Sequence, residues 1–560
     1  MPTAVDCIDL KRRFDALVSS RSSVEQEWDA VERFVAPLGS GAQLDAGSGE
    51  SSVRWRRSEV WDFTAIDGAQ KLAASIHGSV TSPAVRWFRL QFREKALNED
   101  REAREWLDAV GDRIFDALQD SDFNKEVSSC YQDLVAFGNT FVVEEAVEDG
   151  TWQGIDFTAV PLREAYFEED WRGGVLRFFR RLSWTPAQIV DKFGELAPQA
   201  VKEKAAKPEG ASEKLEVIFC IFPRPKVAKE RVAAPELRPW GMVHFLGETG
   251  ERLGDEGGYY EMPVFLARWE KTSASRWGHG PGNIALSTVM YLNAFLEATL
   301  GAAEKAVDPP MMTTERGLLS DLDMESGGLT VVSNPEDLRA LPTAGRFDVS
   351  VEMIQDLRSQ IRSIFKTDEL QLRDSPAMTA TEVQVRYELM NRVLGSTLAR
   401  LQADFLGPLI EIAAHILGRS GQLPAMPDQV KRAGGQTNIE YQGPISRAQR
   451  SDEVASIERL ASFVAGLVKM GFTDAAAVFD AAKAVRETAD RLGVPAAVIA
   501  SPEEVQKKNQ AAAQLQQRMA QAEAARAEGE AVAQRAEAQG AVQSMPAQPT
   551  PIVAPTLLGA

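Results

Sequence analysis

Three glycines stand where a chain could bind phosphate. Gly278, Gly280 and Gly282 directly precede a predicted helix, and free backbone amides at a helix N-terminus attract anions. Pro281 removes one of these amides, and the segment fits neither the G-x-G-x-x-G spacing nor the Walker lysine pattern. We therefore interpret it as a flexible lead into the helix. A nucleotide-dependent hydrolase that uses the Gly278 to Gly282 loop stays open as an alternative.

The remaining candidates for metal binding or catalysis are weaker. Asp321, Asp323 and Glu325 lack the turn glycine and the terminal glutamate of a calcium loop, which favours a solvated acidic loop. No H-E-x-x-H or Cys/His cluster is present, and no serine stands in a G-x-S-x-G setting. The sequence therefore predicts no catalytic, cofactor-binding or metal-binding residue. The histidines are scattered, at His77, His244, His279 and His415.

A basic stripe has two interpretations. Arg358, Arg362 and Lys366 follow one another at four-residue steps on a predicted helix, about a quarter to a third of a turn from its apolar face. Such a stripe can be an ordinary solvated face. It can also be a positive rail that touches phosphates weakly.

Two predicted helices in mid-chain organise the rest. Residues 283–307 and 347–366 each carry apolar side chains at three- and four-residue steps, which gives each helix one narrow apolar stripe. Asp308, Pro309 and Pro310 end the first helix, because proline cannot donate the next backbone hydrogen bond. Helices with one narrow apolar face cannot bury it alone, so they need each other or neighbouring subunits.

The other elements predict an α+β, mainly helical chain. Residues 6–35 read as a helix broken around Ser19 to Ser23, and Thr64 is the expected N-cap of the next helix. Between Thr140 and Lys271 six segments have the composition of strands, interrupted by a short helix from Pro186 and a charged loop at 197–212. The remaining predicted elements are helices at 99–119 and 123–138, an extended aromatic run at 87–92, a long helix from 379 kinked at Gly407 and Pro408, a strand at 438–445, two helices within 451–497, and an Ala/Gln-rich tail.

Composition limits the class of protein. A chain of 560 residues exceeds one ordinary core, which indicates several domains or one elongated subunit. Its 62 basic and 81 acidic residues give a net charge of −19, which argues against a protein that coats nucleic acid. Three cysteines are too few for a disulfide framework and indicate a reducing compartment. We expect neither a signal peptide nor a membrane span, and hence a soluble protein.

The order of several short motifs resembles the head-to-tail connecting (portal) proteins of short-tailed, podovirus-type phages. The resemblance runs from residue 1 to about 505 and leaves out the Ala/Gln-rich tail. Its motifs are W-D-x-T-A at Trp61 to Ala65, T-x-P-x-x-x-W-F at Thr81 to Phe88, R-W with G-x-G-P from Arg268 to Pro281, Pro309-Pro310, M-T-A-T-E-V at Met378 to Val383, and Pro444 with Ala448, Gln449 and Arg450.

The resemblance implies a ring, usually of twelve copies, at one vertex of the capsid. It implies a non-enzymatic conduit for double-stranded DNA, without a cofactor. The implied partners are the terminase large subunit, the major capsid and scaffolding proteins, and the tail adaptor or tail tube proteins. The implied parts are a wing at 1–282, stem helices at 283–307 and 347–366, a clip at 308–346, a tunnel loop at 367–379, a long wing helix at 380–419, a crown at 420–500 and a tail at 501–560.

On this mapping the basic stripe would lie at the channel. Arg358, Arg362, Lys366 and the tunnel-loop residue Arg373 are the hypothesised channel-facing residues. Twelve copies at −19 each would bring −228 to the ring, and a mainly acidic conduit repels DNA phosphates so that the duplex slides. A scaffold-like virion adaptor without a pore is a further alternative.

Overall fold

The computed structural model describes most of the chain. The described residues are 6–37, 60–84, 86–148, 152–207, 210, 213–224, 234–273, 275–313, 318–321, 330–334, 336, 338–340, 347–370, 394–434, 436–441, 444–470, 472, 479–492, 505, 507–508, 510–522, 526 and 529. The chain forms two compact units, Met1–Asp480 and Ala481–Ala560.

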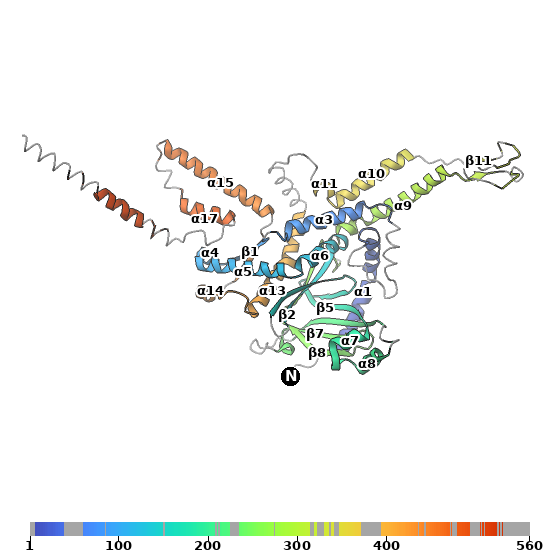
Figure 1. Ribbon diagram of the computed structural model, residues 1–560, viewed down its shortest axis with the longest axis horizontal. Coiled ribbons are helices and arrows are strands. Elements are labelled where there is room, and N and C mark those ends of the chain that lie inside the picture. The colour runs from blue at the N-terminus through green and yellow to red at the C-terminus, as the bar shows by residue number, and fades with distance from the viewer. Residues whose placement is uncertain are drawn as a thin grey trace, which may run out of the picture. The chain divides into compact units, whose positions relative to one another are not determined.

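Two antiparallel sheets form the centre of the first unit (Figure 1). The smaller sheet has the order β3-β2-β9, from Trp152–Val160, Asn139–Glu148 and Val264–Arg268. The larger is a meander of β4 (Ala165–Glu169), β5 (Val175–Trp184), β6 (Leu215–Pro223), β7 (Trp240–Leu246) and β8 (Arg252–Tyr259). All six predicted strand segments are confirmed, and β4 and β8 are additional strands.

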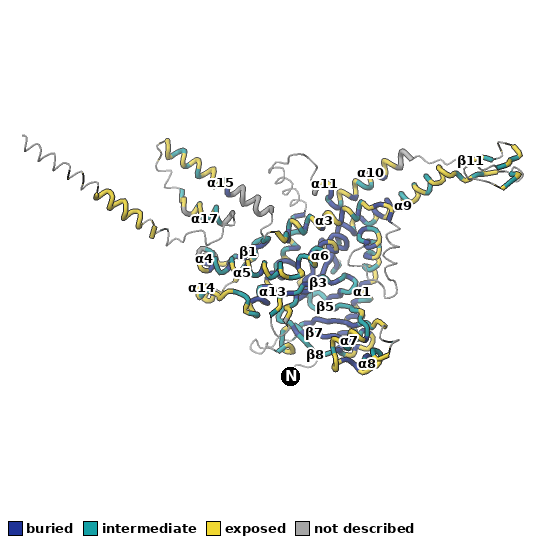
Figure 2. The backbone as a smooth tube through the Cα atoms, in the orientation of Figure 1, coloured by how far each residue is buried: buried dark blue, intermediate teal, exposed yellow. Residues whose placement is uncertain are grey.

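Helices cover the smaller sheet. α6 (Phe123–Phe137) packs on β2 and β3, and α3 (Thr64–Val80) packs on α6. Side chains from both helices and from β2 form one core, in which Leu72, Phe137 and Phe141 are fully buried. Figure 2 shows this buried layer through the strands and α6. The neighbouring elements are α4 (Lys95–Glu99), α5 (Arg101–Asp120), and β1 (Phe88–Phe92) paired with β12 (Thr437–Tyr441).

The first helix is continuous, contrary to the predicted break. α1 runs from Cys7 to Phe34. The hydroxyls of Ser19, Ser20 and Ser22 donate back to helix carbonyls, a local bond that lets serine stay inside a helix. Arg21 is 2% exposed and donates to the carbonyls of Leu162, Arg163 and Ala165. These tertiary bonds hold the serine segment helical.

Two further local predictions were wrong. Thr64 is the first residue of α3 and not its cap, and its amide donates to Asp62 Oδ1 at 2.9 Å. The charged segment 197–212 was expected to be a loop, but Gln199–Ala206 forms α8. α8 buries Val201 with Ile189 of α7 (Pro186–Phe193) and Leu253 of β8, and one buried anchor is enough for a short amphipathic helix.

The two mid-chain helices are present. α9 (Pro281–Val307) and α10 (Phe347–Ile364) pack against each other, and α10 and α11 (Thr367–Leu370) also pack on α3. At the outer end of α9, β10 (Met311–Met312) pairs with β11 (Arg339–Ala340) (Figure 1). α10 ends two residues before the predicted bound, and Lys366 takes φ 55° in the turn that follows.

The predicted irregularity at Gly407 and Pro408 is also present. A π-helical turn, Gln402–Leu406, leads into α13 (Gly407–Arg419), and the Gly407 amide bonds Gln402 O. Pro408 has no amide to continue the α-helical ladder, and Tyr441 Oη donates to the same carbonyl at 2.9 Å. The first unit continues with α14 (Asp428–Ala433) and α15 (Pro444–Lys469). In the second unit α17 (Ala481–Leu492) and residues 510–522 are helical.

One buried carboxyl in β2 gives a test of this fold. Glu144 is 1% exposed, and neither carboxyl oxygen has a hydrogen-bond partner. Burial, with a smaller contribution from Glu261, raises the pKa of Glu144 well above its ordinary value. An acid whose pKa is raised in the folded state keeps its full contribution at low pH, and stability falls as pH rises from the unfolded pKa toward the folded one.

Glu144→Gln removes this ionisation. We expect the stability of the variant relative to the natural chain, measured as the urea midpoint, to increase from pH 5.5 to pH 8. The reason is that only the glutamate must keep its proton as the pH rises. Glu248→Gln, at an exposed position in the β7–β8 turn, is the control and should show no such trend. An equal difference at both pH values would contradict an un-ionised Glu144.

Candidate functional site at the base of α9 and α10

The base of α9 is held by close backbone contact. Gly138 ends α6 with φ 75°, and a Cβ there would lie 2.4 Å from the Gly280 nitrogen. A Cβ on Gly282 would lie 2.2 Å from Ala136 O. The glycines of this segment are therefore needed because two backbones touch, which is one of the roles that only glycine fills.

Three successive amides of the glycine segment already donate within the chain. Gly278 N donates to Asn139 Oδ1 at 2.7 Å, and His279 N donates to Glu270 O at 2.8 Å. Gly280 N donates to Asn283 Oδ1 at 3.0 Å. A phosphate-binding turn needs amides that point at the anion, so this arrangement supports the structural interpretation and gives no support to the nucleotide-dependent alternative.

A buried polar cluster joins α9, α10 and the segment before α3. Asn293 of α9 is 3% exposed, and its Oδ1 accepts from Trp61 N at 2.8 Å and Asp62 N at 3.1 Å. The carboxylate of Asp62 accepts from Arg358 Nε of α10 at 2.8 Å. Asn293, Asp62 and Arg358 thus form one connected cluster, here called the base cluster.

Because the base cluster is buried, its charged groups must be paired and hydrogen-bonded. The Asp62 side chain is 3% exposed and the Arg358 side chain 31% exposed. A buried carboxylate is tolerated only when it is paired and hydrogen-bonded, and Asp62 has both the guanidinium and the Thr64 amide. Because each partner comes from a different element, these bonds fix how α9 and α10 leave the body of the protein. Phe365, after α10, adds a fully buried ring against Gly68 of α3.

The hypothesised channel residues differ in their surroundings. Arg358 belongs to the base cluster, whereas Arg362 is exposed one turn further along α10. Lys366 is half-buried and follows the end of α10. The helical stripe of basic side chains therefore extends only from Arg358 to Arg362. Arg373 and most of the segment 367–379 lie outside the described residues. The first four residues of that segment form α11, so the predicted loop can begin no earlier than residue 371.

α9 itself departs from one expectation. By length and composition it is apolar enough to cross a membrane, and only 22% of its most apolar window is buried, although no such span was expected. Its base packs into the protein core through Ala285, Val289 and Leu292, and a helix that packs against other protein passes the same test. Along the outer half, Leu300 is 44% exposed and Val307 87% exposed.

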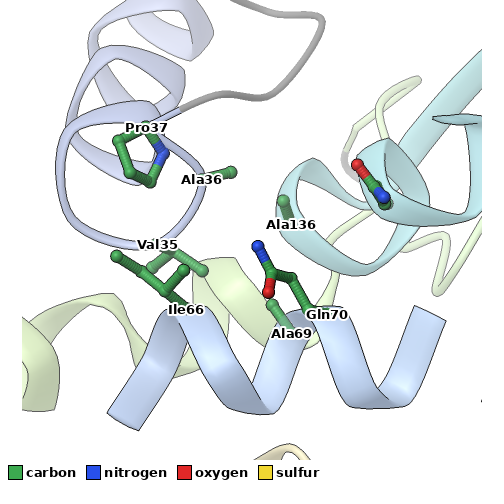
Figure 3. Close-up of a pocket in the computed structure, with 8 residues that line it drawn as sticks. Val35, Ala36, Pro37, Ile66, Ala69, Gln70 and Ala136 are labelled. Atoms are coloured by element: carbon green, nitrogen blue, oxygen red, sulfur yellow. The ribbon is translucent and has the colours of Figure 1, made fainter. Parts of the chain in front are cut away.

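A hollow near the base offers no reactive group. It lies between the residues that directly follow α1, helix α3 and helix α6, and Gln70 reaches across it toward Ala136 (Figure 3). The hollow is lined by Val35, Ala36, Pro37, Ile66, Ala69, Gln70, Gln132 and Ala136. None of these side chains ionises near neutral pH. The hollow therefore supports no acid–base or nucleophilic chemistry.

Groups that could bind metals or act as nucleophiles are dispersed or buried. Within the described residues no three His, Cys, Asp or Glu side chains gather in a way that could hold a metal ion. Of the predicted acidic loop, Asp321 is described, whereas Asp323 and Glu325 lie outside the described residues. Burial raises the pKa of the Cys130 and Cys220 thiols, which keeps them protonated and unreactive. Burial, helped by Lys192, lowers the pKa of His244 to about 3.

The described residues form a mixed sheet-and-helix body with two long paired helices, α9 and α10. The chain matches the family described as bacteriophage head to tail connecting protein over residues 8–499, and it belongs to that family. It is a phage virion portal protein, and the family is structural and non-enzymatic.

Two curated relatives agree over nearly the whole chain. One is the "Probable portal protein" of Bordetella phage BPP-1, 27% identical over 534 residues, which cover 92% of each chain. Another is the "Portal protein" of Salmonella phage epsilon15, 26% identical over 511 residues, which cover 89% of each chain. The family match at residues 8–499 includes the two long helices as well as the sheets.

The base cluster was not found from the sequence. In the sequence, Asp62 is 231 residues away from Asn293. It is 296 residues away from Arg358, its ion-pair partner. One signal was available, since Asn293 is a polar residue next to Val289 and Leu292 on the apolar face of α9. A buried amide there requires a partner, but the sequence alone does not say which.

The base cluster can be tested by coupling. In a double-mutant cycle of Asp62→Asn and Arg358→Gln, we expect a coupling of about 1–2 kcal/mol in the free energy of unfolding, because each change leaves the other group unpaired in a mostly buried place. The matched control is Asp67 with Lys71, an exposed pair at 2.7 Å on α3, with an expected coupling below about 0.5 kcal/mol. Similar coupling in both cycles would contradict the role given to Asp62.

The glycine contact can be tested by adding a methyl group. Gly138→Ala should destabilise the protein by about 3 kcal/mol or more, because it combines positive φ with a backbone clash. Gly78→Ala on α3 is the control, since a Cβ there meets nothing within 4 Å, and helix propensity makes it neutral or stabilising. Thermal unfolding of both variants gives the answer. Full stability of Gly138→Ala would refute the close contact with Gly280.

Proposed function

We propose that copies of this chain close into a ring at one vertex of the capsid of a short-tailed phage, and that double-stranded DNA passes through the ring during packaging and ejection. The observation that carries the proposal is α9, whose apolar surface is largely uncovered by its own chain. An exposed apolar helix of about 40 Å is unfavourable in water, and neighbouring copies around an axis would cover it.

We propose the following parts for the subunit. The stem, expected at 283–307 and 347–366, is formed by α9 and α10, because these helices project together from the body and the β10–β11 pair lies at their outer end. The segment between them, 308–346, is the clip. The wing is 1–282 with the long helix 380–419, the tunnel loop lies within 371–379, after α11, the crown is 420–500 and the tail is 501–560.

The net charge of the chain supports a conduit through which DNA slides. Twelve copies would bring −228 to the ring, and an acidic wall repels phosphates. Arg358, Arg362, Lys366 and Arg373 would supply the weak positive contacts nearest the channel. Arg362 is exposed on α10 and available for this role. Arg358 would act mainly by holding the stem, because its guanidinium pairs with Asp62.

The partners follow from the place of a portal in the virion. The clip would dock the terminase large subunit during packaging and the tail adaptor or tail tube proteins afterwards. The wing would meet the major capsid and scaffolding proteins, and assembly would take place in the host cytoplasm. Force and nucleotide hydrolysis would come from the terminase, since the amides of Gly278, His279 and Gly280 are already bonded within the chain.

Electron microscopy of the purified full-length chain tests the ring. We expect closed rings with a central hole, because only a closed arrangement covers α9 in every copy. The buffer should include low and moderate salt, since acidic copies repel one another less when charges are screened. A monodisperse monomer at micromolar concentration under both conditions would overturn the proposal, as would particles without a hole.

Charge reversal tests the channel residues. Arg362→Glu, alone and with Arg373→Glu, should alter the length of packaged DNA or its retention while rings still form, because these side chains would face the duplex and not the subunit core. Glu304→Arg, an exposed charge change near the end of α9, is the control. Normal packaging and retention in both Arg variants would remove these residues from the channel.

A further inference from the structure

Two aromatic side chains beside the base cluster are largely exposed. Trp61 is 46% exposed and Phe63 is 62% exposed, while Asp62 between them is 4% exposed. The backbone is fixed by the amides of Trp61 and Asp62 on Asn293 and by the Asp62 carboxylate on Arg358. The two rings are thus held outward on a rigid segment, which lowers the entropic cost of binding a partner.

The opposite side of α9 carries a second apolar stripe. Starting at Ile284, it advances by steps of four and three residues, the spacing of a helix seam that packs on another protein surface. Ile284 is 55% exposed and Tyr291 51% exposed. The stripe contains no charged residue and consists of Ile284, Thr288, Tyr291, Phe295, Ala298 and Ala302.

The two surfaces face different directions. At about 100° per residue, Asn293 lies roughly half a turn from Ile284 and Tyr291. Trp61 is bonded to Asn293, so the Trp61–Phe63 pair is fixed at the Asn293 side of α9 and cannot fold onto the stripe of its own chain. A projecting surface on one side and an uncharged stripe on the other are what a head-to-tail contact between identical subunits requires.

We propose that Trp61 and Phe63 of one copy pack on the Ile284–Ala302 stripe of the next copy. This inference rests on the ring proposed above and adds the residues that meet. Copies with a charge of −19 repel one another, so they approach best where both surfaces are uncharged, as here. Exposed aromatic side chains on rigid segments are the residues that contribute most to protein interfaces.

Cysteine cross-linking of the full-length chain tests the contact. Phe63→Cys is combined in one chain with a cysteine at position 284, 288, 291 or 295, and assembled protein is treated with a mild oxidant. We expect a ladder of covalent multimers on a non-reducing gel for at least one stripe position, because a disulfide forms where the two Cα atoms lie within about 7 Å. The natural cysteines, Cys7, Cys130 and Cys220, are buried and should not contribute.

Controls separate this contact from the ring itself. Phe63→Cys combined with Glu297→Cys, an exposed α9 position off the stripe, should give no ladder, and neither should Phe63→Cys alone. Rings in the microscope without a ladder at any stripe position would overturn the contact and leave the ring standing. A protein that forms no ring under any condition would overturn the ring first.

A second pair of variants avoids reliance on cross-linking. Phe63→Glu and Tyr291→Arg change exposed side chains, so circular dichroism should show folded chains in both. Each alone should weaken ring assembly at least tenfold in concentration, and the double variant should recover part of it through the new charge pair. Unchanged assembly in both single variants would contradict the contact.

Discussion

Asp62 carries its charge with almost no access to water, and the placement of two long helices depends on how that charge is satisfied. Its carboxylate accepts from Arg358 of α10 and from the Thr64 amide, while its own amide donates to Asn293 of α9. A buried carboxylate without these bonds would cost several kcal/mol. The base cluster therefore makes the observed arrangement of α9, α10 and α3 much more stable than other arrangements of these helices. The close backbone contact between Gly138 and Gly280 also fixes the base of α9.

From this fixed base, α9 divides into two parts with different needs. At the base, Ala285, Val289 and Leu292 are buried by the chain itself. Further out, α10 covers one face, and other apolar side chains such as Leu300 and Val307 stay exposed. A rigid base combined with an uncovered outer part is the form of a subunit that becomes complete only beside a copy of itself. The proposed ring and the proposed Trp61–Phe63 contact both start from this division.

Much of the fold could be predicted because local pattern and tertiary structure agree. The stripes of α9 and α10, the aromatic strand segments and the proline-linked irregularity at Pro408 follow from periodicity and from backbone chemistry. The errors have tertiary causes. α1 stays helical across its serines because Arg21 bonds carbonyls about 140 residues away, and β8 was missed because three glycines in Arg252–Tyr259 hide its pattern. The base cluster joins residues too distant in sequence for any local pattern to connect.

The central claim is that neighbouring copies cover the exposed surface of α9. Hydroxyl-radical footprinting of the isolated chain and of the assembled particle measures this directly, since oxidation of Tyr291 and Leu300 reports solvent access at two positions along the helix. The account predicts that both side chains react readily in the isolated chain and are strongly protected after assembly. Equal reactivity in the two states would show that assembly leaves α9 exposed, and would contradict the account.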